Sequence, residues 1–130
     1  MPVDFTNKHI LLFGAGKSAT VLINYLKNIS TEKNWLVTVA DSDLKTVQQK
    51  VGEHANMKAA AVDVLNSEER RDHISRADLI ISLMPPQLHY LIAVDCLAHK
   101  KHLLTASYLD EDIKKLSSQI KQSGALFYLR

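Results

Sequence analysis

The stretch LLFGAGKSATVL, residues 11–22, decides how the rest of the chain is interpreted. Counted from Gly16, its Gly-Lys-Ser run resembles the end of a P-loop, which holds a nucleoside triphosphate. Counted from Gly14, its Gly-x-Gly-x-x-Ala pattern resembles the first turn of a dinucleotide-binding fold. A P-loop requires a further glycine five residues before Gly16, and Leu11 occupies that position. The triphosphate interpretation is therefore excluded.

The residues of this turn meet the requirements of a dinucleotide site. An apolar strand precedes the turn, Gly14 makes its tight bend, and Gly16 lets a pyrophosphate approach the backbone. Ala19 is small enough for close packing of helix on strand. The N–H groups near Ser18 and Ala19 would receive the pyrophosphate at the helix N-terminus, with Lys17 as a cation on the solvent side. Glycines also end strands for steric reasons, so a purely structural turn stays an alternative.

Beyond this turn, short apolar runs rich in β-branched residues alternate with segments that are apolar every three or four residues. This alternation predicts an α/β fold, a three-layer Rossmann fold with a mainly parallel, doubly wound sheet of about six strands. We expect strands at residues 9–13, 36–40, 58–62, 79–83, 102–105 and 125–128. Helical stripes fall at residues 19–29, 44–51 and 113–120, the last with a predicted N-cap at Asp110.

The composition predicts one ordinary intracellular domain. The chain has 130 residues, of which 46% are hydrophobic, enough for one core and too few for two. Its 16 basic and 14 acidic side chains are scattered, so we expect neither nucleic acid nor a membrane as a partner. Cys96 is the only cysteine, which excludes an internal disulfide. No signal peptide or long apolar run is present, so we expect a cytoplasmic location.

Acidic residues follow the second and third predicted strands. Asp41 ends the second strand, where a carboxylate accepts hydrogen bonds from the adenosine ribose. A carboxylate there repels a 2′-phosphate, which favours NAD, with NADP as the alternative. Ser42 separates Asp41 from Asp43, which competes for the same role and is equally well explained as a helix N-cap. Asp63 and Val64 follow the third strand, where such folds meet the adenine; an ordinary turn is the alternative.

The ends of the fourth and fifth predicted strands bear most on function, because ligands of open parallel sheets lie beyond those ends. The first is the run Ser82, Leu83, Met84 and Pro85. The second includes Ser107 and Tyr108, which would offer two hydroxyls beside a nicotinamide; a capped loop is the alternative. We expect His89 to be a hydrogen-bonded structural histidine rather than a catalytic one. No ligand spacing predicts a metal site.

The run ADLIISLMPPQLHYLIAVDCLAHKKHLLTASY, residues 77–108, resembles the saccharopine dehydrogenase family, in its glutamate-forming branch. Members pair an Ile-Ser-Leu-Leu-Pro strand end and a Leu-His helix start with a Val-Thr-Ala-Ser-Tyr strand end. The similarity extends over residues 10–130. It implies the NAD(P)-binding domain of an oxidoreductase of lysine metabolism. Such an enzyme oxidises the secondary amine of saccharopine by hydride transfer, and water splits the imine into glutamate and aminoadipate semialdehyde.

The resemblance also implies roles for residues, while the general base stays unassigned. It assigns the pyrophosphate to residues 14–19, the ribose to 41–43, the adenine to 63–64, the nicotinamide side to 82–85, and saccharopine to Ser107 and Tyr108. Three features depart from the family pattern. Lys17 replaces an aromatic residue, an extra residue near Asp41 makes the ribose carboxylate ambiguous, and Pro86 adds a second proline.

In the family, the sixth strand leads into a Gly-Leu-Asp-Pro-Gly segment and a substrate domain, whereas this sequence stops at Arg130. The resemblance therefore implies that residues 1–130 are a cofactor domain from a longer chain, inactive by itself; a homodimer of the full-length protein stays open. Two alternatives remain. One is a stand-alone NAD-sensing regulatory module of a channel or transporter. The other is a relative that acts on another imine, such as in polyamine synthesis.

Overall fold

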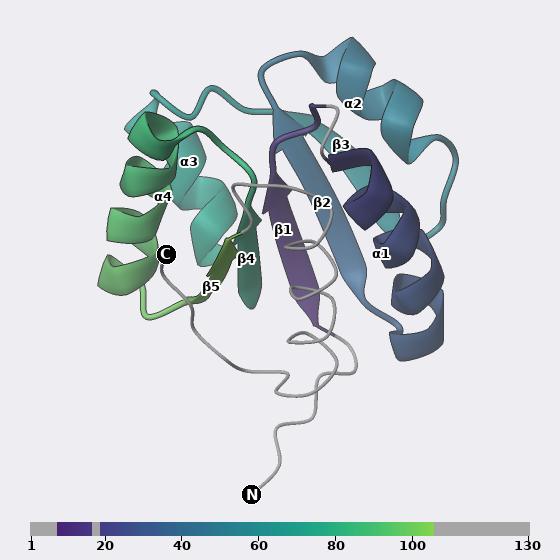
Figure 1. Cartoon of the computed structure of the whole chain (residues 1–130). Coiled ribbons are helices and arrows are strands. Elements are labelled where there is room, and N and C mark those ends of the chain that lie inside the picture. Colours follow the sequence, from purple (N-terminus) through teal and green to yellow (C-terminus); the bar gives the residue numbers. More distant parts are fainter. Residues whose placement is uncertain (1–7, 17–18, 106–130) are drawn as a thin grey trace, which may run out of the picture.

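The computed structural model describes residues 8–16 and 19–105, in which five strands and four helices alternate (Figure 1). The predicted sixth strand and the helical stripe at residues 113–120 lie outside the described residues, as do Lys17, Ser18, Ser107 and Tyr108. In chain order the elements are β1 (His9–Phe13), α1 (Ala19–Lys33), β2 (Leu36–Asp41), α2 (Leu44–Val51), β3 (Met57–Ala61), α3 (Ser67–Ser75), β4 (Leu79–Ser82), α4 (Pro86–Ala98) and β5 (His102–Thr105).

Strand boundaries differ from the predicted ones by a single residue. β2 includes Asp41, β3 is shifted one residue toward the N-terminus, and β4 ends at Ser82. The backbone pairing continues past two of these ends. Val62 N–H donates to the carbonyl of Asp41 at 2.9 Å, and Leu83 N–H donates to that of Phe13 at 2.9 Å. Val62 and Leu83, the predicted last residues of these two strands, therefore still pair with the sheet at the carboxyl ends of its strands.

The strands form one parallel sheet in the order β3-β2-β1-β4-β5. Phe13 of β1 is aligned with Ala40 on one side and with Ser82 on the other, so the carboxyl ends of the three strands lie level. The chain winds outward from β1 to β3, then crosses back to β4 beside β1. Neighbouring β1 and β4 thus lead into helices on opposite faces, which opens a crevice at their carboxyl ends.

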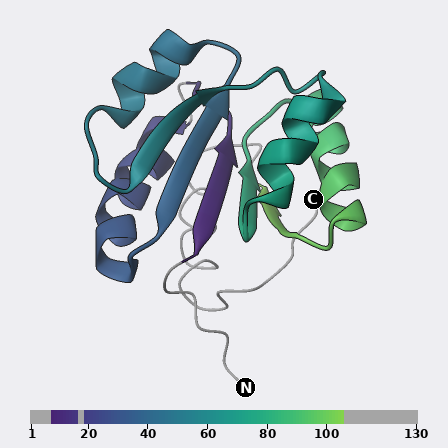
Figure 2. The same ribbon diagram turned by 180° about the vertical axis from the view of Figure 1, so that it is seen from behind.

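Helices cover both faces of the sheet (Figure 2), and an apolar layer on each face holds them there. Successive side chains of β1 point to opposite faces, as in any strand, and both faces are buried. One layer contains Ile10 and Leu12 together with Leu22 and Leu26 of α1 and Val47 of α2. The other contains Leu11 and Phe13 together with Ile74 of α3 and Ile92 and Cys96 of α4. The predicted doubly wound Rossmann fold is confirmed.

Candidate functional site

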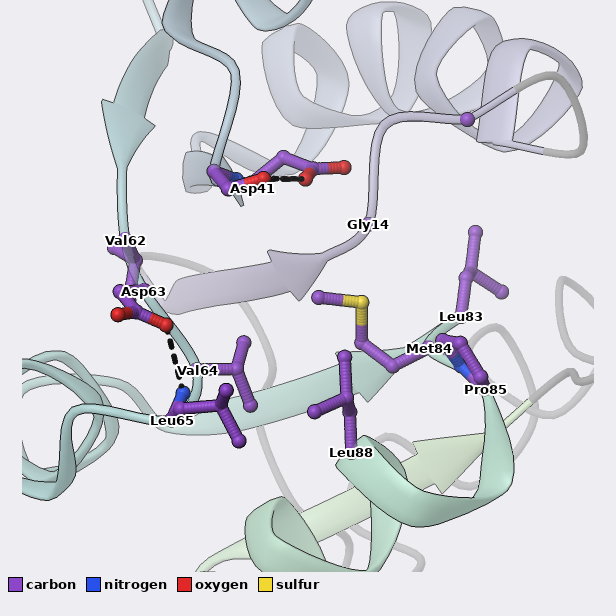
Figure 3. Close-up of a pocket in the computed structure, with 12 residues that line it drawn as sticks. Gly14, Asp41, Val62, Asp63, Val64, Leu65, Leu83, Met84, Pro85 and Leu88 are labelled. Carbon is purple, nitrogen blue, oxygen red and sulfur yellow. Dashed lines mark hydrogen bonds between the residues drawn. The ribbon is translucent and has the colours of Figure 1, made fainter.

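A cavity of about 470 Å³ opens at the carboxyl ends of β1 to β4, a volume typical of a small-molecule site (Figure 3). Four segments that are far apart in the sequence meet there: the glycine turn after β1, the end of β2, the loop after β3, and the start of α4. The lining residues are Gly14, Gly16, Asp41, Ser42, Val62, Asp63, Val64, Leu65, Leu83, Met84, Pro85 and Leu88.

Most of the predicted site residues within the described chain line this cavity, but three do not. Ala19 is buried in the first turn of α1. Ser82 is buried at the end of β4, where its hydroxyl accepts a 3.4 Å hydrogen bond from the N–H of Met84. Asp43 lies on the neighbouring loop. None of these three residues is among those that line the cavity.

Three lining residues were not predicted from the sequence. Val62 and Leu65 flank the predicted Asp63-Val64 pair, and Leu88 lies in the first turn of α4, three residues after Pro85. The helical spacing from Pro85 to Leu88 could have identified Leu88, because residues three apart share one helix face. Leu65 is 72% exposed, and an apolar side chain beside a polar turn gave no comparable signal.

Asp41 and Asp43, the two candidates for the ribose carboxylate, differ in their hydrogen bonds. Oδ2 of Asp41 accepts a 2.7 Å hydrogen bond from the N–H of Ala15, and Oδ1 accepts a 2.6 Å bond from the N–H of Ser42. Asp41 is thereby fixed beside the glycine turn, and its oxygens keep lone pairs for ligand hydroxyls. Asp43 is instead the N-cap of α2, and hydrogen bonds from Thr46 lower the pKa of its carboxyl. The geometry favours Asp41 as the carboxylate that faces a ligand.

The two glycines of the turn differ in their surroundings. Gly14 has φ +111°, and a Cβ there would lie 3.3 Å from the Cβ of Leu83. The fold itself therefore requires glycine at position 14. Gly16 has no such constraint, because a Cβ there would meet no atom within 4 Å. Gly16 is a wall residue that leaves open space in front of its backbone.

A lysine from α2 braces this turn, and sequence reasoning did not find it. Lys50 Nζ donates to the carbonyl of Gly16 at 2.6 Å and to the hydroxyl of Thr20 at 2.9 Å. It thereby places a cation beside the segment where an anion is expected. Its distance of 34 residues from Gly16 explains why no local pattern pointed to it.

The loop after β3 forms the opposite wall. Asp63 Oδ1 accepts a 3.0 Å hydrogen bond from the N–H of Leu65, and the Asp63 carbonyl accepts a 2.9 Å bond from the N–H of Asn66. Asp63 thus organises a turn, as its structural interpretation predicted, and it also lines the cavity, while its contact with an adenine stays a prediction.

His89, in α4, does not show the expected hydrogen bonds. Both of its ring nitrogens are buried, and neither has a hydrogen-bond partner in the part of the chain that the structure describes. Within the described part of the chain, the prediction that His89 is hydrogen-bonded is therefore wrong. Burial lowers the pKa of the imidazole and favours its neutral form.

Residues 8–16 and 19–105 contain neither a reactive thiol nor a cluster of metal ligands. Burial raises the pKa of Cys96 to about 12, so its thiol stays protonated and is a poor nucleophile. No three His, Cys, Asp or Glu side chains of this part gather where they could hold a metal ion. Over the same residues, no helix has both the length and the apolar character needed to span a membrane.

Comparison with known proteins gives a consistent result. Residues 10–127 match the family model described as the saccharopine dehydrogenase NADP binding domain. The mitochondrial alpha-aminoadipic semialdehyde synthase of Bos taurus is 32% identical over 121 residues, which cover 92% of this chain and 12% of that protein. The NADP(+), L-glutamate-forming saccharopine dehydrogenase of Schizosaccharomyces pombe is 31% identical over 117 residues, which cover 90% of this chain and 25% of that protein.

A solved structure extends the comparison to three dimensions. The apo histidine-tagged saccharopine dehydrogenase (L-Glu forming) from Saccharomyces cerevisiae superimposes with a TM-score of 0.69 at 26% identity, covering 85% of this chain and 24% of that one. The chain thus spans between 12% and 25% of the length of the oxidoreductases it matches here. Because the family model covers nearly the whole chain, the protein belongs to the saccharopine dehydrogenase family and comprises its NAD(P)-binding Rossmann domain.

Proposed function

We propose that the cavity at the carboxyl ends of β1 to β4 is where this domain binds its dinucleotide. The pyrophosphate lies over the turn that contains Gly14 and Gly16, and the adenosine ribose lies against Asp41 and Ser42. The adenine lies beside Asp63 and Val64, and the nicotinamide lies toward residues 82–85. This arrangement is supported by the cavity, which joins all four segments in one continuous surface.

One observation carries the proposal: the fold does not require a glycine at position 16. Its φ lies outside the positive range, and a side chain there would enter open space. A glycine without a structural reason, on the wall of a cavity and at the head of a helix, is explained by a ligand that touches its backbone. A pyrophosphate is such a ligand, because N–H groups at a helix N-terminus bind anions.

We further propose that the domain serves the oxidation of saccharopine in a protein that also contains the remaining parts of its relatives. Of the two carbons bonded to the secondary amine, the one that becomes the aldehyde gives up a hydride to the nicotinamide, and the nitrogen loses a proton, which leaves an imine. Water then adds to the imine and releases glutamate and aminoadipate semialdehyde. The names of the relatives support this reaction. Substrate contacts at Ser107 and Tyr108, a cytoplasmic location and a homodimer stay predictions.

Two measurements test these proposals separately. Titration of the chain with NADH and with NADPH, followed by nicotinamide fluorescence, should show saturable binding of at least one of them. Absence of binding to both would overturn the assignment of the cavity. Incubation of the chain with saccharopine and oxidised cofactor should produce no reduced nicotinamide. Turnover by the chain alone would overturn the proposal that the reaction needs further parts of the protein.

A further inference from the structure

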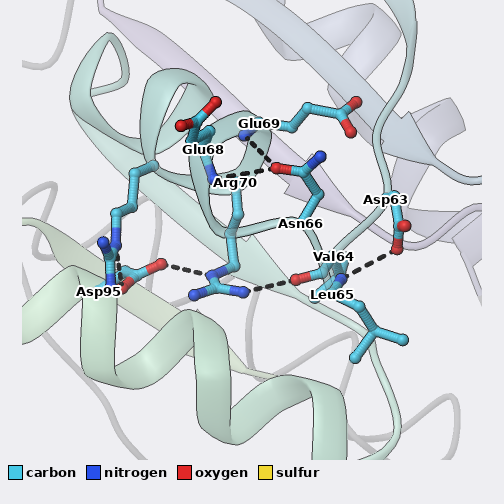
Figure 4. Close-up of polar contacts among 9 residues, drawn as sticks. Asp63, Val64, Leu65, Asn66, Glu68, Glu69, Arg70 and Asp95 are labelled. Atoms are coloured by element: carbon cyan, nitrogen blue, oxygen red, sulfur yellow. Dashed lines mark hydrogen bonds and ion pairs between the residues drawn. The ribbon is translucent and has the colours of Figure 1, made fainter.

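A buried ion pair lies behind the wall formed by the loop after β3 (Figure 4). Arg70 of α3 donates from Nε to Oδ2 of Asp95 in α4, and their side chains are only 6% and 3% exposed. Arg71 pairs with the other oxygen of Asp95 at 3.2 Å, but its side chain is 58% exposed. Two adjacent arginines thus share one carboxylate, one from inside the protein and one from its surface.

Only the inner arginine of this pair reaches the cavity wall. Arg70 Nη1 donates a 2.6 Å hydrogen bond to the carbonyl of Val64, a lining residue. Because a guanidinium is planar and its N–H groups are fixed relative to one another, the bond to Asp95 determines where the Val64 carbonyl sits. The helix that carries Asp95 also presents Leu88 to the cavity. Arg70 therefore links two sides of the cavity from behind.

The rest of the loop is anchored from the same side. Asn66 caps α3 by accepting hydrogen bonds from the N–H groups of Glu68 and Glu69, at 3.0 and 3.2 Å. The cap and the Arg70 bond hold both ends of the short segment from Val64 to α3. The backbone of the wall is therefore set by α3 and α4 rather than by the loop itself.

Stability alone is a weak reason for this buried pair. Apolar side chains of similar size often replace a buried ion pair with no loss of stability, because the desolvation of two charges offsets much of their attraction. What apolar side chains would not supply is a donor for the Val64 carbonyl. The distinctive contribution of Arg70 is therefore the position of the wall.

We propose that Arg70 is a positioning residue for the adenine part of the site. Held by Asp95, it keeps the wall of residues 62–65 at the distance from α4 that fits an adenine ring and excludes a wider base. This inference rests on the proposed binding of a dinucleotide in the cavity.

The test compares NAD with its 1,N6-etheno derivative, in which a fused ring widens the adenine. The main variant combines Arg70→Met with Asp95→Leu, which removes both buried charges together. Arg71→Met is the matched control, because Arg71 shares Asp95 but does not contact Val64. Calorimetric titration gives both dissociation constants, and thermal unfolding shows whether each variant folds. Arg70→Lys serves as the second variant, since it keeps a charge opposite Asp95 and loses the planar fork.

The wild-type chain should bind NAD more tightly than the etheno derivative. In the double variant, NAD should bind about tenfold more weakly and the etheno derivative nearly unchanged, so that the discrimination is lost. Arg70→Lys should reduce the discrimination in the same direction, and Arg71→Met should leave it unchanged. Equal weakening of both ligands, or no weakening, would overturn the positioning role. If the wild-type chain binds neither NAD nor its etheno derivative, the same comparison is made with NADP and etheno-NADP, and a chain that binds none of the four would overturn the proposed function itself.

Discussion

Gly14 and Gly16 lie two residues apart, yet alanine should destabilise the fold at position 14 and should weaken cofactor binding at position 16. Gly16→Ala should leave the free energy of unfolding unchanged or raise it by about 0.5 kcal/mol, since it restricts only the unfolded chain. It should weaken NADH binding at least about tenfold, because the new methyl group occupies space needed by the pyrophosphate. Urea unfolding and NADH titration of the same protein samples measure both quantities.

Gly14→Ala is the matched comparison. Its φ of +111° and the Leu83 side chain 3.3 Å from the added Cβ should destabilise the fold by about 1–3 kcal/mol. Normal NADH affinity in Gly16→Ala would remove the main support for the assignment of the cavity.

Asp41 should control the choice between the two dinucleotides. Its carboxylate at the cavity repels a 2′-phosphate, which supports NAD, whereas the matching family model is described as NADP-binding. Asp41→Asn removes the charge and should shift the ratio of NADH to NADPH affinity at least about tenfold toward NADPH. Parallel fluorescence titrations with both cofactors measure the ratio.

Asp43→Asn is the control for Asp41→Asn. It removes the same charge two residues away, and asparagine keeps the capping of α2. Its affinity ratio should stay at the wild-type value. If both variants shift the ratio equally, the effect is one of overall charge and Asp41 has no special role.

The sequence predicted those lining residues that stand directly at the carboxyl end of a strand. Gly14 and Gly16 follow β1 and Asp41 is the last residue of β2, and such positions place a residue at the edge where ligands of parallel sheets lie. The choice between Asp41 and Asp43 was beyond the sequence, because both are acidic and either suits a cap. It depends on the direction of each side chain, which the hydrogen bonds to Ala15 and Thr46 reveal. Lys50 was hidden for a similar reason, since α2 must fold back onto α1.

At the scale of elements, α3 is the helix that the apolar pattern did not mark. Its sequence, SEERRDHIS, buries one apolar side chain, Ile74, and one charged side chain, Arg70. The buried face of a typical surface helix repeats apolar residues, and here an arginine occupies one of those positions. Its partner Asp95 is 25 residues further along. A pattern of apolar residues alone therefore does not detect this helix.

The N-terminus of α3, a helix of only nine residues, is stabilised by its N-cap residue Asn66. Asn66→Ala should lower the free energy of unfolding by about 1 kcal/mol, because the N–H groups of Glu68 and Glu69 lose their acceptor. Asn66→Ser, which still accepts such a bond, should recover most of the loss. Chemical denaturation of the three proteins measures the effect, and equal stability of the alanine and serine variants would exclude the capping contribution.

For the whole molecule, the sequence predicted the alternation of strands and helices better than it predicted which strands are neighbours in the sheet. Alternating strands and helices imply a parallel sheet, because a right-handed crossover helix joins each pair of parallel strands. Phe13 at the end of β1 and Leu79 at the start of β4 are 66 positions apart in the sequence. That these two strands are neighbours in the sheet is a property of the doubly wound order. The site is built on this adjacency, since it brings Leu83 to Gly14. The predicted sixth strand lies outside the described residues.

The stability of the whole domain should depend on pH through His89. Burial lowers the pKa of this imidazole in the folded protein, whereas in the unfolded chain it titrates near about 6.5. The unfolded state therefore binds more protons as the pH falls, so the contribution to stability is complete above about pH 6.5 and is lost progressively below it. Burial also lowers the pKa of His73, which adds to the same trend.

His89→Leu should make the free energy of unfolding less dependent on pH between about 7.5 and 5.5, because one proton-binding site of the unfolded chain is removed. Urea unfolding at several pH values in this range gives the slope for each protein. The residual slope of the variant should be reduced further by a second change, His73→Gln. A slope that is the same in the wild type and in His89→Leu would show that the buried ring does not couple folding to protonation.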